Sequence, residues 1–260
     1  MEFTHLLAIV GDEPVFGTDL LLAGDVDADD VRRQLSRWVS AGRLYQLRRG
    51  LYALAPPFQR ARPHPFLVAN RMVRGSYVSQ QAALAHYGLI PEAAPVVTSV
   101  TTGRPGRWET HLGVYEYRHV KSGLFFGYRL AEISPGQRAF IATPEKALLD
   151  LVHLRAGGDE PAYLAELRLQ NLERLDLDAL RGLAEQAARR LHLETPLALV
   201  TLLVLAYSSG MSLVAVRELS RLEARIRSLA EAVALLDART YRVQDQRPAA
   251  DPPSPPAPED

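Results

Sequence analysis

Arginine is concentrated in one stretch of the chain that contains no carboxylate. Residues 31–91 hold ten arginines and neither Asp nor Glu, a local charge of +10. The planar guanidinium makes paired hydrogen bonds to phosphates and to guanine edges, so such a stretch attracts a polyanion. Residues 1–30 show the opposite bias, with eight acids and no Lys or Arg. The stretch predicts a nucleic-acid partner, with the alternative that its arginines form a solvated face paired with the acidic residues beside it.

The composition of the whole chain hides this asymmetry and bounds the class of protein. Of 260 residues, 30 are Lys or Arg and 30 are Asp or Glu, so the formal net charge is zero. A hydrophobic content of 47% is ordinary for a globular protein and excludes a fibrous or wholly disordered chain. The lack of cysteine excludes disulfides, thiolate metal sites and thiol nucleophiles. Since no basic leader precedes a long apolar run, we expect no export signal and a cytoplasmic protein.

Residues 4–54 predict the elements that would position the arginines. Apolar residues indicate a first helix that stops at Gly11, and Thr18 is a candidate cap for a short second helix. A third helix is expected between a cap at Asp27 and a stop at Gly42. Residues 43–54 form two apolar runs about a glycine turn, which is typical of a β-hairpin. This order is that of a winged helix-turn-helix, whose third helix enters the major groove and whose hairpin contacts the backbone or minor groove.

The candidate DNA-binding residues lie on the third helix and on the hairpin. The expected buried stripe of the helix consists of Val31, Leu35, Trp38 and Val39. The residues expected to face the major groove are Arg33, Ser36, Arg37 and Ser40, with Arg32 as a phosphate contact. The hairpin candidates are Arg43, Arg48 and Arg49. We expect double-stranded DNA, the protein's own operator, as the partner; inverted repeats there would require a dimer or two monomers in tandem.

The rest of the chain predicts an α+β protein with several domains. We expect a winged helix at 1–56, a mixed helix and antiparallel-sheet domain at 63–142, a helical C-terminal region at 143–240 and a disordered proline-rich tail at 241–260. The proline-rich run at 56–65 is interpreted as a linker. The expected strands of the middle domain are 96–101, 108–110, 114–120 and 124–128, after a helix capped by Ser79. A further helix is expected after the cap Thr143, with Pro144 as its first residue.

Several short motifs occur in the order found in one known family. They are residues 42–44 (GRL), 49–52 (RGLY), 76–92 (SYVSQQAALAHYGLIPE), 100–104 (VTTGR), 126–127 (FG) and 141–150 (IATPEKALLD). On these motifs most of residues 5–155 resembles the AbiEi family, the antitoxins and transcriptional regulators of type IV toxin-antitoxin systems. The resemblance implies a winged-helix repressor of its own operon that counteracts a nucleotidyltransferase-type toxin, and a direct contact with that toxin is not assumed. The extension after Met211 lies outside the resemblance.

The sequence shows no residue set with the spacing of a catalytic or metal site. Glu145 and Asp150 are five residues apart on an expected helix, about 140° around its axis, and so do not converge. Lys146 and Asp150 are four apart and can form an ion pair. The histidines have neither i, i+4 spacing nor an HExxH motif, and residues 103–106 predict a hairpin turn, not a phosphate loop. We therefore expect no enzyme, cofactor or metal; the enzymatic alternative, a nuclease, would need a carboxylate cluster.

The C-terminal region raises the questions of membrane contact and self-association. Residues 195–216 lack charge, but Pro196 and the break at 207–210 favour two buried helices over a membrane span, so no membrane contact is expected. The last expected helix has a heptad spacing compatible with a parallel homodimer, the alternative being packing onto its own bundle. Its seam consists of Leu219, Leu222, Ile226, Leu229, Val233 and Leu236. A second functional hypothesis is that the helical region binds a protein partner directly, as a regulator or interaction module without antitoxin activity.

Overall fold

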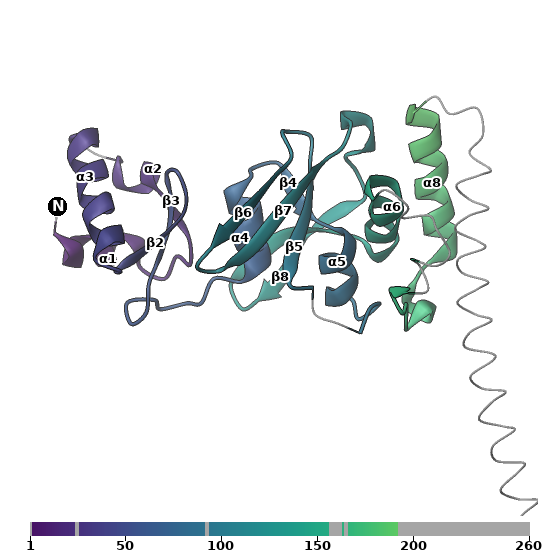
Figure 1. Cartoon of the computed structure of the whole chain (residues 1–260), viewed down its shortest axis with the longest axis horizontal. Coiled ribbons are helices and arrows are strands. Elements are labelled where there is room, and N and C mark those ends of the chain that lie inside the picture. The colour runs from purple at the N-terminus through teal and green to yellow at the C-terminus, as the bar shows by residue number, and fades with distance from the viewer. Residues whose placement is uncertain (1, 24–25, 92–93, 156–162, 164–165, 192–260) are drawn as a thin grey trace, which may run out of the picture. The chain divides into compact units, whose positions relative to one another are not determined.

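The computed structural model of the protein describes residues 2–23, 26–91, 94–155, 163 and 166–191 (Figure 1). All of them belong to one compact unit, residues 1–206. They form helices and two β-sheets, which confirms the predicted α+β class. None of the described helices is long and apolar enough to cross a membrane. The uncharged segment at 195–216, the heptad seam at 219–236 and the tail at 241–260 lie outside the described residues.

The N-terminal module, residues 3–54, combines short helices with a small sheet. Its elements are α1 (Phe3–Val10), β1 (Phe16–Gly17), α2 (Thr18–Leu21), α3 (Ala28–Ser40), β2 (Leu44–Arg48) and β3 (Leu51–Leu54). The strands are antiparallel in the order β1-β3-β2. Their core includes Leu6 and Leu35, both fully buried, and Trp38. The apolar positions of the helices thus meet the hairpin in one small hydrophobic core.

Two details of this module differ from the prediction. Gly17, not Thr18, occupies the N-cap position of α2, and it makes no side-chain cap bond. Thr18 is held instead by the hairpin, because its N–H donates to the Gly50 carbonyl at 3.0 Å. The two-residue strand β1 was not predicted, since a pair of residues is too short to show an alternating pattern.

A six-stranded sheet forms the centre of the middle region. Its strands are β4 (Ser76–Val78), β5 (Val96–Thr101), β6 (Gly106–Thr110), β7 (Gly113–His119), β8 (Tyr128–Ser134) and β9 (Gln137–Ala142), in the order β6-β7-β5-β4-β9-β8. The sheet is mixed, and the expectation of an antiparallel sheet was wrong for two pairs. β5 runs parallel to β7 because β7, the second strand of a hairpin, is the one that joins β5, and β4 runs parallel to β9.

The predicted strand at 124–128 was also wrong. Residues Ser122–Leu124 form the short 3₁₀ helix η1, and β8 begins only at Tyr128. β4 and β9 were not predicted at all. Both strands lie inside the sheet, where each pairs with a neighbouring strand on either side, and most of their residues are buried.

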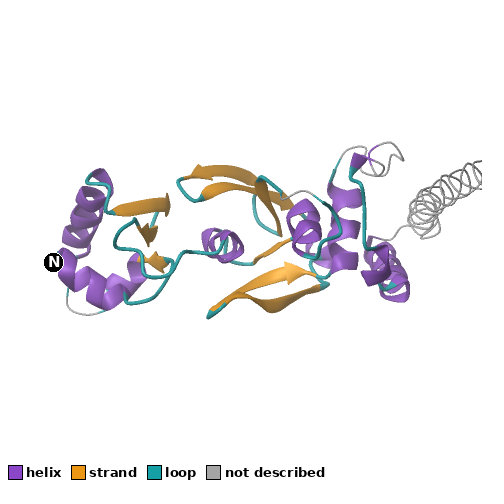
Figure 2. Cartoon of the chain, turned by 90° about the horizontal axis from the view of Figure 1, so that it is seen from below, coloured by secondary structure: helices purple, strands orange, loops and turns teal. Residues whose placement is uncertain are grey.

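The helix α4 (Pro65–Met72) occupies part of the run expected to be a linker. His64 caps it by accepting the Phe66 N–H at 3.2 Å, and Pro65 takes the first turn, where its missing N–H costs nothing. The sheet curls around this helix, which is seen nearly end-on between the two outer hairpins in Figure 2. Tyr117 of β7 donates its hydroxyl to the Ala69 carbonyl at 2.7 Å, so α4 is fixed to the sheet.

The remaining helices extend the same hydrophobic core along the chain. They are α5 (Gln80–His86), α6 (Pro144–Leu154), η2 (Leu172–Arg174) and α8 (Leu177–Leu191). α6 begins as predicted, with the Thr143 hydroxyl accepting the Lys146 N–H, and α8 lies beside it (Figure 1). Ala147 of α6 and Ala184 of α8 are buried in one cluster with Val78 and Ile141 of the sheet. One core therefore runs across the predicted domain boundary at 142–143.

Candidate nucleic-acid interface

The helix α3 begins at the predicted cap. Asp27 accepts the N–H groups of Asp29 and Asp30 at 2.7 and 3.0 Å. These two backbone hydrogen bonds lower the pKa of the Asp27 carboxyl, since they favour its ionised form. Gly42, which follows the helix, has φ +68°, the left-handed conformation expected at this stop. Both ends of the helix are therefore set by its own sequence.

The predicted binding residues of α3 lie on its exposed face. Val31, Leu35 and Trp38 are buried, and Val39 is half-buried, in agreement with the predicted stripe. The exposed side chains are Arg32, Arg33, Ser36, Arg37 and Ser40. The last four of these follow the spacing i, i+3, i+4, i+7, which places them on one side of the helix. The structure therefore brings together the residues that were expected to face a groove.

Two of the helix arginines have acidic partners in the first turn of α3. Arg32 lies 2.8 Å from Asp29, and Arg33 lies 3.6 Å from Asp30. All four side chains are at least 46% exposed, so each pair contributes little stability and exchanges readily with water or another anion. Arg37, one turn further on, has no carboxylate partner within the described residues.

Three other arginines of the basic stretch pair with carboxylates of the acidic stretch, residues 1–30. Arg60 lies 3.5 Å from Asp12, Arg71 lies 3.7 Å from Glu13, and Arg74 lies 3.5 Å from Asp19. With the two pairs inside α3, five of the ten arginines in residues 31–91 are thus matched by nearby carboxylates. The alternative interpretation of the charge pattern, internal pairing with the acidic stretch, holds for this half.

The arginines without a carboxylate partner, within the part of the chain that the structure describes, belong mostly to α3 and the hairpin. They are Arg37, Arg43, Arg48, Arg49 and Arg62. Arg43 lies over the Phe3 ring, 5.0 Å from its centroid, a cation–π contact that leaves the guanidinium edge open. Arg49 is exposed at the hairpin turn, beside Gly50 with φ +76°. These positive charges can meet an external anion without first breaking an ion pair.

Arg48 and Arg49, expected to act together, lie in different environments. The Arg48 guanidinium donates to the Met72 carbonyl at the end of α4. In the same strand, Tyr45 stacks on His111 with ring centroids 4.7 Å apart. One side of the hairpin therefore contacts the middle region, which leaves Arg49 as the freer of the two hairpin arginines.

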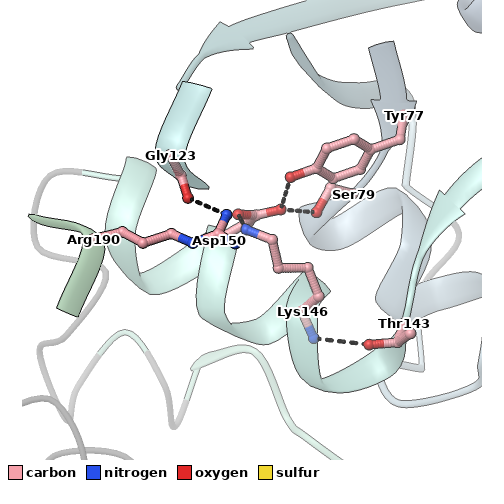
Figure 3. Close-up of polar contacts among 7 residues, drawn as sticks. All are labelled: Tyr77, Ser79, Gly123, Thr143, Lys146, Asp150 and Arg190. Atoms are coloured by element: carbon pink, nitrogen blue, oxygen red, sulfur yellow. Dashed lines mark hydrogen bonds and ion pairs between the residues drawn. The ribbon is translucent and has the colours of Figure 1, made fainter. Parts of the chain in front are cut away.

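A buried ion pair forms the second polar cluster, and Figure 3 shows its members. Lys146 Nζ lies 2.5 Å from Asp150 Oδ1, with side chains only 2% and 1% exposed. Tyr77 and Ser79 donate their hydroxyls to Asp150 Oδ2 at 3.0 and 2.7 Å. The predicted Lys146–Asp150 pair is confirmed. The two hydroxyl donors were not predicted from the sequence. Tyr77 and Ser79 are separated from Asp150 by 73 and 71 positions along the chain, so no local pattern connects them.

The chemistry of this cluster points to a structural role. Burial raises the pKa of the Asp150 carboxyl, while the Lys146 ammonium and the two hydroxyls oppose that rise. Lys146 Nζ also lies 4.9 Å from the centroid of the Phe126 ring, so the ammonium is enclosed by an aromatic face and a carboxylate. Burial raises the pKa of Tyr77 far above its ordinary value. The buried Lys146–Asp150 pair, together with the Tyr77 hydroxyl that donates to Asp150, thus joins α6 to β4.

In residues 2–191, apart from the undescribed gaps, no three His, Asp or Glu side chains gather as they would around a metal ion. No family model matches the chain, and no curated protein matches its sequence.

Proposed function

We propose that the N-terminal module is a winged helix-turn-helix that binds double-stranded DNA, and that the protein is a cytoplasmic transcriptional repressor of its own operon. The order α1, α2, α3 and the β2–β3 hairpin supports this proposal, since it matches the arrangement in which a third helix reads the major groove. The exposed face formed by Arg33, Ser36, Arg37 and Ser40 supplies donors for phosphates and base edges.

The distribution of ion pairs is the observation that carries the proposal. Of the four arginines of residues 31–91 that lie outside the module, three pair with carboxylates of residues 12–19, and these are Arg60, Arg71 and Arg74. Arg37, Arg43 and Arg49 of the module have no carboxylate partner among the described residues. Within residues 31–91 the arginines without a carboxylate partner are thus concentrated on the module, where their charge can attract an external anion.

Binding of the full-length protein to the DNA upstream of its own gene tests the proposal. Fluorescence anisotropy should show at least about tenfold tighter binding to this duplex than to a scrambled one, with affinity falling as salt rises. Arg74→Ala is the matched control for substitutions of the module's arginines, because it removes one exposed arginine that is already paired with a carboxylate. Equal affinity for both duplexes, or no binding at low ionic strength, would contradict the proposal.

On the resemblance to the AbiEi family we further propose that the protein acts as an antitoxin. Its functional partner would be a nucleotidyltransferase-type toxin encoded beside it, with no stable complex required. Co-expression with the neighbouring gene product should restore growth that the product alone prevents. Rescue that fails while operator binding persists would remove the antitoxin part and leave a transcriptional regulator.

A further inference from the structure

The strand β8 forms one edge of the six-stranded sheet, and half of its backbone groups point away from the sheet. The Thr143 N–H donates to the Gly127 carbonyl at 2.9 Å, which marks 127 and 143 as a hydrogen-bonded pair in the β8–β9 register. In an antiparallel ladder such pairs alternate with non-bonded ones. Residues 129 and 131 therefore face β9.

The contacts of β9 confirm this alternation. Phe140, the partner of Leu130 in the register, donates its N–H to Asn70 Oδ1 at 2.6 Å and not to β8. Leu130 thus directs its own N–H and C=O to the free edge, and Tyr128 and Glu132 do the same. Within the described part of the chain no hydrogen bond reaches Leu130 from outside the β8–β9 pair.

The same place exposes the largest apolar pair on the sheet. Leu130 is 48% and Phe140 is 42% exposed, and they are directly opposite each other on β8 and β9. Beside them, Glu132 stands opposite Arg138. An apolar patch next to an open row of donors and acceptors is what a further strand would cover.

We propose that a second copy of this chain covers it, through antiparallel pairing of β8 with β8 about a twofold axis at Leu130. The two Leu130 side chains then join the two Phe140 rings into one apolar strip across four strands. Residues 128, 130 and 132 of one copy oppose 132, 130 and 128 of the other, so that every outward backbone group of this segment gains a partner. This inference goes beyond the proposed function and does not depend on it.

Charge and strand length together favour this register, since an axis at Tyr128, the first residue of β8, would leave most of the strand unpaired. An axis at Arg129 would oppose two guanidinium groups, and one at Glu132 would oppose two carboxylates. An axis at Ala131 would place the Glu132 carboxylate against Leu130 of the partner copy. With the axis at Leu130, Arg129 opposes Ala131 and Glu132 opposes Tyr128, so no like charges meet.

The expected dimer exchanges with monomer. The register shift between Glu132 and Ser134 ends the regular part of β8, so pairing is confined to about five residues a side, fewer than the 20–30 of a standard interface. The measured mass of the full-length chain should therefore rise from 28.8 kDa toward twice that value as concentration increases.

Cross-linking tests the axis directly, because the chain has no cysteine of its own. In a hydrogen-bonded antiparallel pair the two Cα atoms at position 130 lie about 5.5 Å apart, within disulfide reach. The corresponding atoms at position 132 lie about 14 Å apart, since they are offset by four residues along the strands as well as across them. Leu130→Cys should form a cross-linked dimer under mild oxidation at least about tenfold faster than Glu132→Cys or Leu177→Cys, an exposed apolar position elsewhere.

Opposite charges at the axis give a second test. Leu130→Lys and Leu130→Glu should each keep the full-length protein monomeric, with an unchanged circular dichroism spectrum, and an equimolar mixture of the two should associate again. Leu177→Lys should leave the association unaltered. Equal cross-linking at all three positions, a monomer at every concentration, or association that survives Leu130→Lys would overturn the proposal; the last result would assign self-association to another surface, such as the 219–236 seam.

Discussion

Ser79 donates its hydroxyl to Asp150 at 2.7 Å, although it stands at the N-cap of α5. Ser79 therefore makes no cap bond to α5, and the Ala82 N–H in the first turn of that helix donates instead to Thr98 Oγ1 at 3.3 Å. The Ser79 hydroxyl joins the end of β4 to α6, 71 residues away in the chain. A local capping rule is therefore overridden by the need of a buried carboxylate for donors.

Removing the partner of that carboxylate should be costly. Lys146→Ala leaves Asp150 buried without its counter-charge, and we expect a loss of about 3–5 kcal/mol in the free energy of unfolding. Urea denaturation of the full-length chain measures it. The double substitution Lys146→Met with Asp150→Leu removes both charges and should cost less than Lys146→Ala alone. A loss below about 0.5 kcal/mol for Lys146→Ala, typical of surface positions, would contradict the burial of this pair.

The cap of α4 should make stability depend on pH. His64 accepts the Phe66 N–H only when that ring nitrogen is unprotonated, and burial together with His86 lowers the pKa of His64 below its ordinary 6.5. A lowered pKa in the folded state means that the unfolded chain takes up the proton first. The contribution is therefore fully present above pH 6.5 and is lost as the pH falls through the folded-state pKa.

Thermal unfolding between neutral and mildly acidic pH measures this effect. His64→Asn keeps an acceptor at the cap but cannot titrate, so its melting temperature should fall less on acidification than that of the unaltered protein. Burial also lowers the pKa values of His86 and His153, and both remain in the variant, so the difference isolates His64. Parallel curves for the two proteins would refute the assignment.

The two wing arginines should set the salt dependence of DNA binding. Replacing Arg48 and Arg49 together by Ala is expected to weaken binding to all duplexes and to reduce the slope of log affinity against log salt by about one to two units. Since Arg48 also donates to the Met72 carbonyl, Arg49→Ala alone should account for most of the change. An unchanged slope in the double variant would count against the hairpin as a wing.

Arg37 should affect sequence discrimination. Arg37→Ala is expected to reduce the preference for operator over random DNA by about 1–3 kcal/mol, because a guanidinium aimed at a base edge reads sequence. Anisotropy with both duplexes gives the ratio directly. Arg32→Ala is the contrasting variant, because Arg32 is the expected phosphate contact, and it should weaken binding to both duplexes equally. An equal loss of affinity for both duplexes in Arg37→Ala would indicate that Arg37 contacts the DNA backbone instead of a base edge.

The elements that could be predicted are those whose signals are local. Asp27 before an amphipathic run, the glycine turn at 50 and the Thr143-Pro144 start each predict one feature from neighbouring residues, and the structure has α3, the hairpin and α6 there. The Lys146–Asp150 pair was predictable for the same reason, as its members are one helical turn apart.

The missed elements depend on distant contacts or on misleading composition. Pro65 suggested a linker, whereas proline at the first helical position, after the cap His64, is compatible with α4. The strand β9 alternates buried Gln137, Ala139 and Ile141 with exposed Arg138 and Phe140, but with a buried glutamine and an exposed phenylalanine this alternation could not be recognised in the sequence. The partners of the basic stretch could not be predicted either, because Arg74 and Asp19 meet only after the chain has folded.

The acidic first turn of α3 would orient that helix in the proposed complex with DNA. Its N-terminal end carries the carboxylates of Asp27, Asp29 and Asp30, and although Arg32 and Arg33 pair with the last two, three carboxylates oppose the attraction that the helix dipole has for a phosphate. The C-terminal half of α3, with Arg37 and Ser40, carries no carboxylate. In the proposed complex the C-terminal half of α3 would therefore approach the duplex more closely, so we expect the operator bases nearest the helix to be those that face its last turn.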